Sequence, residues 1–444
     1  MSLAWDVRSS SGAEGVPEGW QVRRVSDLVT LTNGHPFPSE IFGPTGEIPL
    51  VRIRDLGGGP FETYVTGDVP PAALLRDGDV VIGMDGDFNL TTWNRGPAAL
   101  NQRVCLLRPR DSVDMRFIAY ALPASLKIIN DLTFATTVKH LSSTDVLKER
   151  ITLPRLEEQR RIADFLDAET ARIDQLLEVR HRQGAQLSER DYSMLSEALV
   201  PGIVTKPRGT SPYPWLPDLP QDQSLVRLGY VCRLQNGLTV DSKRDVTRDV
   251  VTRPYLRVAN VQAGHLTLDD VTEITVPRGV AERSTLRPGD VLMTEGGDLD
   301  KLGRGTVWNG ELPDCLHQNH VFALRPDSSS LSGDYLALMT QTLHGRCYFE
   351  STGARTTNLA STNSGKILNF PVPLPSIERQ HALVRRVQAS LQVTAKARTL
   401  LIRQQALLAE RRQALITAAV TGQFDVSTAS GRNVTDNVTE GVAV

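Results

Sequence analysis

The chain has 444 residues, and its 49 Lys and Arg against 51 Asp and Glu give a formal net charge of −2. This length allows roughly two to four domains, and the near-neutral charge lacks the basic excess that nucleic-acid-binding domains often carry. No apolar run could span a bilayer, the N-terminus lacks signal-peptide features, and the four cysteines form no C-x-x-C pair. We therefore expect a cytoplasmic protein with no membrane partner and no disulfide framework.

The first part of the chain, residues 1–153, contains short apolar runs rich in β-branched residues and separated by Gly, Pro, Asn and Asp. Such runs, at 80–83 and 104–107, predict strands. A short helix is predicted near 115–124. These features indicate a mixed α/β domain.

A long helix is predicted over residues 154–200, where the sequence "LPRLEEQRRIADFLDAETARIDQLL" begins at Leu153. Pro154 suits a helix start, the glutamates after it suit the positive end of the helix dipole, and Pro201 ends the pattern. From Glu157 to Val200 such a helix would be roughly 65 Å long. Its apolar residues follow an alternating four-three spacing that is typical of coiled coils: Ile162, Leu166, Ile173, Leu176, Leu187, Met194 and Ala198.

The second half begins after a Pro-rich linker, residues 201–221, and repeats the same order. Residues 222–373 again have apolar runs at 291–294 and 321–324, with a short helix predicted near 333–342. Residues 374–426 predict a second long helix, which Pro375 opens and Gly422 caps. The Ser/Thr/Asn-rich tail, 427–444, is expected to be disordered. The second stripe is Leu383, Val387, Ala397, Leu401, Leu408, Leu415 and Ala418.

Several short phrases show that the two halves are copies of one unit. "VRRVSDLVTLTNG" ends at Gly34 and "VRLGYVCRLQNG" at Gly237; "LLRDGDVVIG" resembles "TLRPGDVLMT"; "NQRVCLLRP" resembles "QNHVFALRP". "PLVRIRDLGGG" and "PYLRVANVQAG" occupy the same place in the order. A repeat this long is a duplicated domain rather than a solenoid unit.

The two predicted helices are expected to bury each other's apolar stripes. The second carries a clear excess of Arg and Lys, and the first carries more acids than bases. Because a domain precedes each helix, pairing requires the second helix to run back along the first. The expected fold is therefore two related α/β domains separated by an antiparallel two-helix coiled coil with pseudo-two-fold symmetry. The alternative is that each stripe packs only against its own domain.

No catalytic motif is present in the sequence. There is no phosphate-binding loop, no G-x-G-x-x-G after a strand and no zinc-hydrolase pattern. Cys315, His317 and His320 lie close in sequence but have no second ligand set, and the Asp85/Asp87 and Asp298/Asp300 pairs are typical of solvated turns. We predict no catalytic, metal-binding or cofactor-binding residue, which favours a binding or assembly protein.

This order resembles the specificity subunit of type I restriction–modification systems, over nearly the whole chain to about Val426. The helix start "PRLEEQRRIADFLD" is similar to that family's motif, and "PSIERQHALVRRV" keeps its Pro375, Glu378 and Gln380. "VTGQFDV" at 420–426 resembles the family's second helix end. The "GDVV" and "GDVL" turns and the "QNHV" segment are also similar.

The resemblance implies a non-catalytic subunit whose two target-recognition domains, 1–153 and 222–373, each recognise half of a bipartite, asymmetric double-stranded DNA target. It further implies that the coiled coil sets the spacer between the halves and docks two modification subunits, adenine methyltransferases that hold S-adenosylmethionine. Restriction subunits using ATP and Mg could join them. The chain itself would hold no cofactor.

Candidate DNA-contacting residues are polar side chains in loops near the repeated phrases. Arg suits guanine, whereas Asn and Gln suit adenine. For each of them a solvated loop position or a bond inside the fold is an equally good interpretation. The candidates are Arg52, Arg54, Asn89, Thr91, Thr92, Arg95, Gln102 and Lys139 in the first domain, and Arg257, Asn260, Lys301, Arg304, Gln318, Asn319, Arg355 and Asn358 in the second.

Two other functions fit the same features. One is a coiled-coil scaffold that assembles partners without recognising DNA. The other is an enzyme of unrecognised type, such as a nuclease acting at the domain ends.

Overall fold

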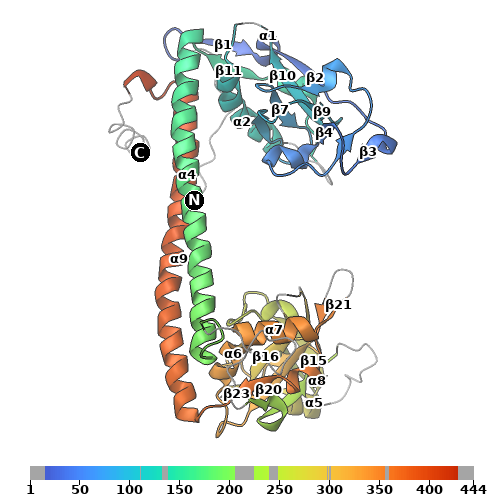
Figure 1. Cartoon of the computed structure of the whole chain (residues 1–444), viewed down its shortest axis with the longest axis vertical. Coiled ribbons are helices and arrows are strands. Elements are labelled where there is room, and N and C mark those ends of the chain that lie inside the picture. Colours follow the sequence, from blue (N-terminus) through green and yellow to red (C-terminus); the bar gives the residue numbers. More distant parts are fainter. Residues whose placement is uncertain are drawn as a thin grey trace. The chain divides into compact units, whose positions relative to one another are not determined.

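The computed structural model describes residues 16–110, 112–132, 139–205, 225–239, 249–297, 299, 302–355 and 360–428. Most of the predicted linker and tail therefore lies outside the described residues. The chain divides into two compact units (Figure 1). Unit 1 combines Met1–Arg180 with Arg403–Val444, and unit 2 is His181–Ile402.

Unit 1 contains a four-stranded antiparallel sheet in the order β2-β10-β7-β8. Its strands are β2 (Val29–Asn33), β10 (Val104–Pro109), β7 (Val80–Gly83) and β8 (Leu90–Thr92). A second sheet has the order β3-β5-β4-β9-β6, with β4 parallel to β9. These strands are β3 (Phe42–Gly43), β5 (Tyr64–Val65), β4 (Ile48–Val51), β9 (Ala98–Leu100) and β6 (Leu74–Leu75).

The first and last strands of this globular part pair with each other, since β1 (Gln21–Arg24) is antiparallel to β11 (Arg150–Leu153). Three short helices, α1 (Val25–Leu28), α2 (Met115–Leu132) and α3 (Ser143–Lys148), complete it. The helix α2 continues past the predicted end near residue 124, although Pro123 lies inside it. Leu126 beyond the proline is fully buried in the core, and this packing outweighs the hydrogen bond that proline cannot donate.

Unit 2 repeats the antiparallel sheet, in the order β13-β20-β16-β18. Its strands are β13 (Cys232–Asn236), β20 (Val321–Pro326), β16 (Val291–Thr294) and β18 (Gly305–Val307). The other strands are β12 (Leu225–Arg227) with β23 (Pro371–Pro373); β15 (Thr272–Pro277), β14 (Val250–Leu256) and β19 (Leu316–His317); and β17 (Gly296–Gly297), β22 (Ala360–Ser361) and β21 (Ala354–Arg355). The helices are α5 (Arg278–Ser284), α6 (Gly333–Gln341), α7 (Leu343–Thr352) and α8 (Ser364–Leu368).

The two units are copies of one fold, as the repeated phrases predict. In both, the antiparallel sheet has the same strand order, one parallel strand pair lies in the second sheet, and the first strand pairs with the last. At the end of the first phrase, Gly34 and Gly237 approach a neighbouring loop closely. A Cβ atom would lie 1.9 Å from the Asn101 carbonyl oxygen at Gly34, and 2.0 Å from that of Gln318 at Gly237.

The repeated "GDV" phrase places a carboxylate below each sheet. Asp79 accepts hydrogen bonds from the Arg108 guanidinium at 2.8 and 2.7 Å. Asp290 accepts the equivalent pair from Arg325. These side chains recur because they hold the turn before the central strand to the strand beside it.

The glutamine of each long-helix motif also has a structural role. The Gln159 side-chain oxygen accepts from the backbone N–H of Asp114, and its amide donates to the Pro154 carbonyl. Gln380 makes the same two contacts with Ser332 and Pro375. The motif thus joins the start of each long helix to the segment that begins α2 or α6.

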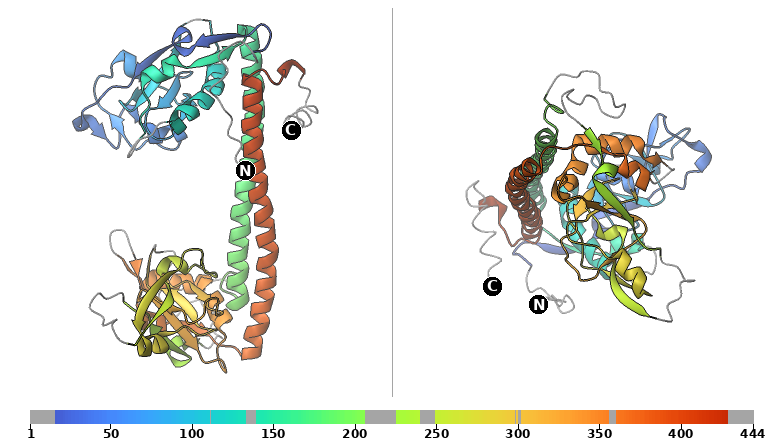
Figure 2. Two further views of the ribbon diagram at one scale, coloured as in Figure 1. Left: turned by 180° about the vertical axis from the view of Figure 1, so that it is seen from behind. Right: turned by 90° about the horizontal axis from the view of Figure 1, so that it is seen from below.

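The two long helices are α4 (Leu156–Leu199) and α9 (Ile377–Val420), and they pack together. In unit 1, Ile162 and Leu166 share a core with Leu415 and Ala419. In unit 2, Leu195 and Leu199 share one with Val384 and Val387. Figure 2 shows the same two helices from two further sides.

The pairing is antiparallel within each unit, because higher residue numbers on α4 meet lower ones on α9. In unit 1, the Phe165 ring packs against that of Phe424, just beyond α9, in a tilted arrangement with ring centroids 5.6 Å apart. Further along, the Arg412 Nε atom lies 3.0 Å from an Asp174 oxygen. The prediction that the stripes bury each other is confirmed, and their ends also pack against the globular parts.

One position of the predicted stripe is wrong. Leu176 is 41% exposed, whereas Ile173 is buried and Leu177 is half-buried. The stripe therefore steps from Ile173 to Leu177, four residues on, rather than three. Polar residues also lie in the helix interface of unit 2, where Asp191 accepts from Arg398 at 2.7 Å.

Candidate nucleic-acid interface

A groove of about 940 Å³ lies in unit 1 beside β8, the edge strand of the antiparallel sheet. The helix α2 and the last turns of α9 form its other walls. Three predicted DNA-contacting residues, Asn89, Thr91 and Thr92, line it together. The structure therefore brings these three candidates together on one concave surface.

The loop before β8 presents its polar residues because one aromatic residue anchors it. Phe88 is 2% exposed and has a φ of 52°, in the left-handed region that non-glycine residues rarely adopt. Asp87 and Asn89 on either side are exposed. The Asn89 carbonyl accepts from the Gly83 N–H, so its backbone is fixed while its amide is available to a ligand.

Basic side chains reach the same groove from other elements. Arg150 of β11 is exposed and lines it, as do Lys127 of α2 and Arg412 of α9. Sequence analysis missed these residues because they lie in regular elements outside the repeated loop phrases. Only the tertiary structure places them opposite β8.

Three other candidates of the first domain are engaged inside the fold. Arg52 pairs with Asp55, with Nε and Oδ2 3.4 Å apart. Arg95 lies 3.7 Å from the Phe61 ring centroid and donates to the carbonyls of Asp55 and Gly59. Lys139 donates to the carbonyl and side-chain oxygen of Asn130, near the end of α2.

The remaining candidates of the first domain are exposed. Arg54 pairs with Glu62 at 3.2 Å, and both side chains are more than half exposed. Gln102 lies in the turn before β10. A surface ion pair of this kind stabilises little, so Arg54 can exchange partners at low cost.

In the second domain, Asn260 and Gln318 contact the fold itself. Asn260 is buried, its amide donates to the carbonyls of Thr267 and Asp270, and its oxygen accepts from the Arg257 N–H. The Gln318 side-chain oxygen accepts from the Val258 N–H at 3.4 Å.

The six other candidates of the second domain are more accessible, only partly described or outside the described residues. Arg257 pairs with exposed Asp270 at 2.9 Å. Asn319 and Arg304 are half-buried. Arg355 is described only as a residue of β21, and Lys301 and Asn358 lie outside the described residues.

Each antiparallel sheet ends in a carboxylate that contacts a histidine. In unit 1, Asp85 lies 2.7 Å from His140 and 3.5 Å from Arg103. In unit 2, Glu295 contacts His320, the counterpart of Arg103 in the repeated phrase. The side chains at these equivalent positions differ between the two units, so they offer different hydrogen-bonding groups.

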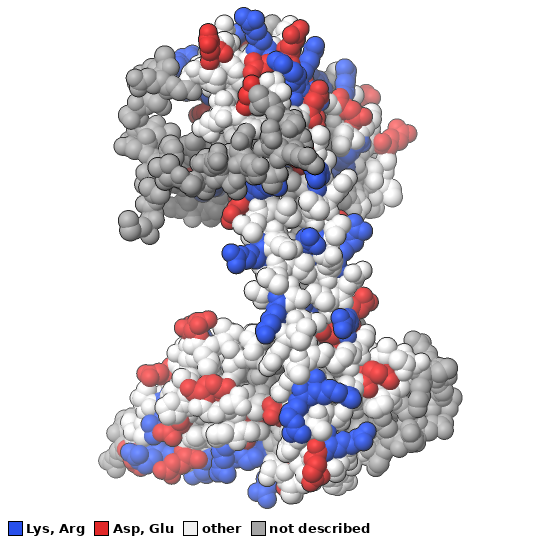
Figure 3. All heavy atoms as spheres, turned by 90° about the vertical axis from the view of Figure 1, so that its left-hand side faces the viewer, with Lys and Arg blue, Asp and Glu red and all other residues white. Residues whose placement is uncertain are grey.

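The charges on one face of the molecule are mixed rather than uniformly basic. On the face drawn in Figure 3, basic and acidic side chains are interspersed on both globular parts. Within the described ranges, no three His, Cys, Asp or Glu side chains are arranged to hold a metal ion. Burial raises the pKa values of Cys105, Cys232 and Cys315 to about 12, which keeps these thiols protonated.

No helix in the described part of the chain combines the length and apolarity that crossing a membrane requires.

The duplicated α/β fold, the paired long helices and the polar groove beside an edge strand define a recognition protein built from two related domains. Residues 17–181 match the family model of the type I restriction modification DNA specificity domain. The specificity subunit of the type I restriction enzyme EcoBI of Escherichia coli is 31% identical over 399 residues, which cover 85% of this chain and 80% of that protein.

The specificity subunit of the EcoKI enzyme of Escherichia coli (strain K12) is 26% identical over 402 residues, covering 84% of this chain and 82% of that protein. A chain from a structural study of complex assembly and conformational transition in the type I R-M system is similar in fold. Its TM-score is 0.67 at 21% identity, and the match covers 92% of this chain and 99% of that one.

The chain therefore belongs to the family of type I restriction enzyme specificity subunits. Its function is that of the DNA specificity subunit of a type I restriction–modification complex, so its partners are DNA and other subunits of such a complex.

Proposed function

We propose that the two globular parts recognise different halves of a bipartite, asymmetric target in double-stranded DNA. The observation that carries this is a shared scaffold with different side chains at equivalent positions. Thr92, which pairs with Val80 beside the groove, corresponds to Val307, which pairs with Val291. Because base edges are distinguished by hydrogen-bonding pattern, such differences give each half its own base preference.

The paired helices act in this proposal as the spacer between the two half-sites. Half-sites about one DNA turn apart, roughly 34–36 Å, require a stiff connection between the domains that bind them. Two helices of 44 residues each, packed over their apolar stripes, supply such stiffness. The buried residues of both stripes favour a fixed register over sliding.

The same helices are proposed to dock two modification subunits, one for each half. Those adenine methyltransferase subunits would hold S-adenosylmethionine, and restriction subunits using ATP and Mg could join the complex. The interspersed surface charges are consistent with a division of labour in which the partners supply much of the phosphate contact. We propose the cytoplasm as the location, where cellular and incoming DNA are accessible.

Methylome sequencing of the host, with and without this gene, tests the bipartite target. We expect one split motif with methylated adenines on both sides of an unspecified spacer, and its loss on deletion. A second arm adds the purified chain to its co-encoded methyltransferase and labelled methyl donor. An unchanged methylome, together with no directed methylation in the second arm, would refute the proposal.

The groove is tested by one pair of substitutions. Asn89→Ala should reduce methylation of the cognate first half-site by about 5- to 150-fold, which corresponds to losing one base contact of about 1–3 kcal/mol. Thr66→Ala, an exposed residue of the same domain that does not line the groove, should leave methylation unchanged. Equal effects of both substitutions would argue against the groove as the DNA contact.

The scaffold alternative is not favoured, because the family is defined by DNA specificity. It would still predict stable partner assembly without sequence-directed methylation, which the second arm would detect.

A further inference from the structure

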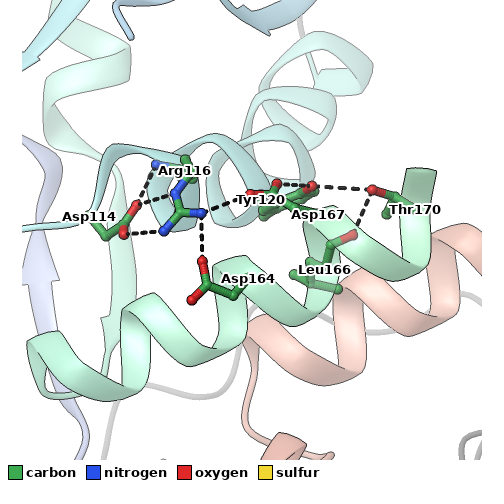
Figure 4. A network of polar contacts seen from close by, with 7 residues as sticks. All are labelled: Asp114, Arg116, Tyr120, Asp164, Leu166, Asp167 and Thr170. Atoms are coloured by element: carbon green, nitrogen blue, oxygen red, sulfur yellow. Dashed lines mark hydrogen bonds and ion pairs between the residues drawn. The ribbon is translucent and has the colours of Figure 1, made fainter. Parts of the chain in front are cut away.

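Arg116 of α2 is the centre of a polar network that joins the first globular part to α4 (Figure 4). Its guanidinium lies 3.0 Å from Asp114 on its own segment, 2.7 Å from Asp164 and 2.9 Å from Asp167. The two latter residues lie one turn apart on α4, so a single side chain holds two successive positions of that helix. The hydrogen bonds that Arg116 donates to Asp114 and, second in effect, to Asp164 raise the pKa of Arg116.

Tyr120, one turn further along α2, extends the network. Its hydroxyl donates to Asp167 at 2.7 Å and lies 3.2 Å from the Thr170 hydroxyl, which itself donates to the Leu166 carbonyl. Burial is the main cause that raises the Tyr120 pKa to about 12, so the hydroxyl remains a donor. The contact therefore extends over two turns of both helices, which resists rotation as well as separation.

Unit 2 has equivalent positions on α6 and α9, and the shared glutamine contact gives the correspondence. Because Gln159 binds Asp114 and Gln380 binds Ser332, Arg116 corresponds to Asp334 of α6. By the same count from the glutamines, Asp164 corresponds to Arg385, and Asp167 to Gln388. Asp334 and Gln388 line one groove of about 380 Å³, so the two elements also face each other there.

The charges at the equivalent positions of the two units are thus reversed. Unit 1 has a cation on the domain helix and anions on the long helix, whereas unit 2 has an anion on the domain helix and Arg385 on the long helix. A domain helix of one unit placed on the long helix of the other would bring like charges together, and like charges at such spacing are destabilising.

We propose that the charges at these positions match each recognition domain to its own long helix, with Arg116 as the positioning residue that sets the orientation of the first domain on α4. The proposal rests on the proposed function, in which that orientation places the first half-site relative to the spacer. Loosening the joint between α2 and α4 should relax the choice of spacer length. Arg116, Tyr120 and Asp167 also line the groove beside β8, so a role in base contact alone would instead lower methylation equally at every spacer.

Two sets of substitutions, called blocks A and B, test the charge matching. Each replaces residues of unit 1 with the corresponding residues of unit 2. Block A, on the α2 side, is Asp114→Ser with Arg116→Asp. Block B, on α4, is Asp164→Arg with Asp167→Gln. Each block alone creates a like-charge contact or loses the ion pairs, whereas the two together restore opposite charges. A matched control is Arg278→Ala, which breaks the exposed Arg278–Asp249 pair of unit 2, away from both grooves.

The first readout is methylation by the full complex on targets whose spacers differ by one base pair. Each single block should lower the preference for the correct spacer by about tenfold, and the combination should recover most of it. The control variant should keep the wild-type preference for the correct spacer. Loss of methylation at every spacer in proportion, or no recovery in the combined variant, would overturn the proposal.

The second readout is the distance distribution between spin labels at Asp68→Cys in the domain and Gln175→Cys on α4, in a Cys347→Ala background. Each block alone should widen the distance distribution, and the two blocks together should narrow it again. This measurement needs no DNA, so it separates the two proposals. If the wild-type complex methylates no split target, the proposed function fails, while the label distances still decide whether Arg116 positions the domain. An unchanged width in both single blocks would refute that role.

Discussion

Arg325 donates two hydrogen bonds to the carboxylate of Asp290, at 2.7 Å from Nε to Oδ1 and 2.6 Å from Nη2 to Oδ2. The Asp290 side chain is 1% exposed and also accepts from the Arg287 N–H. Arg108 and Asp79 form the same arrangement in unit 1. The pair therefore belongs to the shared fold rather than to DNA recognition.

Asp290→Ala should destabilise unit 2 by about 3 kcal/mol, because it leaves the Arg325 guanidinium and a backbone N–H without their partner. Urea unfolding followed by the fluorescence of Trp308 in the same unit measures the change. Asp270→Ala removes an exposed pair with Arg257 and should cost less than about 1 kcal/mol. A loss of similar size in both variants would show that burial of Asp290 is unimportant.

Gly34→Ala and Gly237→Ala should each destabilise their own unit by about 3 kcal/mol or more. A Cβ at either position would overlap a backbone carbonyl, which cannot move away without breaking the parallel bridges beside it. Gly184→Ala in α4 is the control. It meets nothing within 4 Å and should stabilise the helix by about 1 kcal/mol. Thermal unfolding of the three variants tests the prediction, which fails if the three shifts have the same sign.

Unit 2 should lose stability below pH 6.5, because it buries two histidines in their neutral form. Desolvation lowers the pKa of His317 and of His344 to about 4. Between pH 6.5 and 4 the unfolded chain binds protons that the folded unit does not, so stability falls as pH falls through this range. Each histidine should cost on the order of 2 kcal/mol at pH 5.

His344→Gln tests this pH dependence, with exposed His265→Gln as its control. Urea midpoints at pH 7 and pH 5 should differ less in His344→Gln than in the wild type, and equally in His265→Gln and the wild type. A wild-type midpoint that does not fall between these pH values would contradict the burial argument.

Removing one heptad from both helices should shorten the DNA spacer and leave the half-sites unchanged. Deleting residues 177–183 and 403–409 keeps the Asp174–Arg412 and Asp191–Arg398 contacts on either side. Seven residues are about 10.5 Å of helix, which corresponds to about three base pairs. Methylome sequencing of the variant measures the new motif; different half-site bases with the old spacer would exclude the helices as the spacer.

The sequence by itself determined the duplicated architecture, the two central strands of each antiparallel sheet and the two long helices. These follow from local signals: repeated turn phrases at Gly34 and Gly237, β-branched runs such as Val80–Gly83, and a sustained four-three spacing. Such signals lie within a few residues of the element that they specify. The sequence also shows the glutamine in each helix motif. Its structural role is clear only from its hydrogen-bond partners, the backbone N–H groups of Asp114 and Ser332.

The tertiary structure decided which polar side chains are available and which belong to the fold. Asn89 and Asn260 are both loop asparagines in the sequence, yet one lines an open groove and the other bonds three backbone groups. Arg150 and Arg116 carried no signal at all, because their partners lie on elements far away in the chain. Exposure and ion pairing depend on such distant contacts, so no local pattern could reveal them.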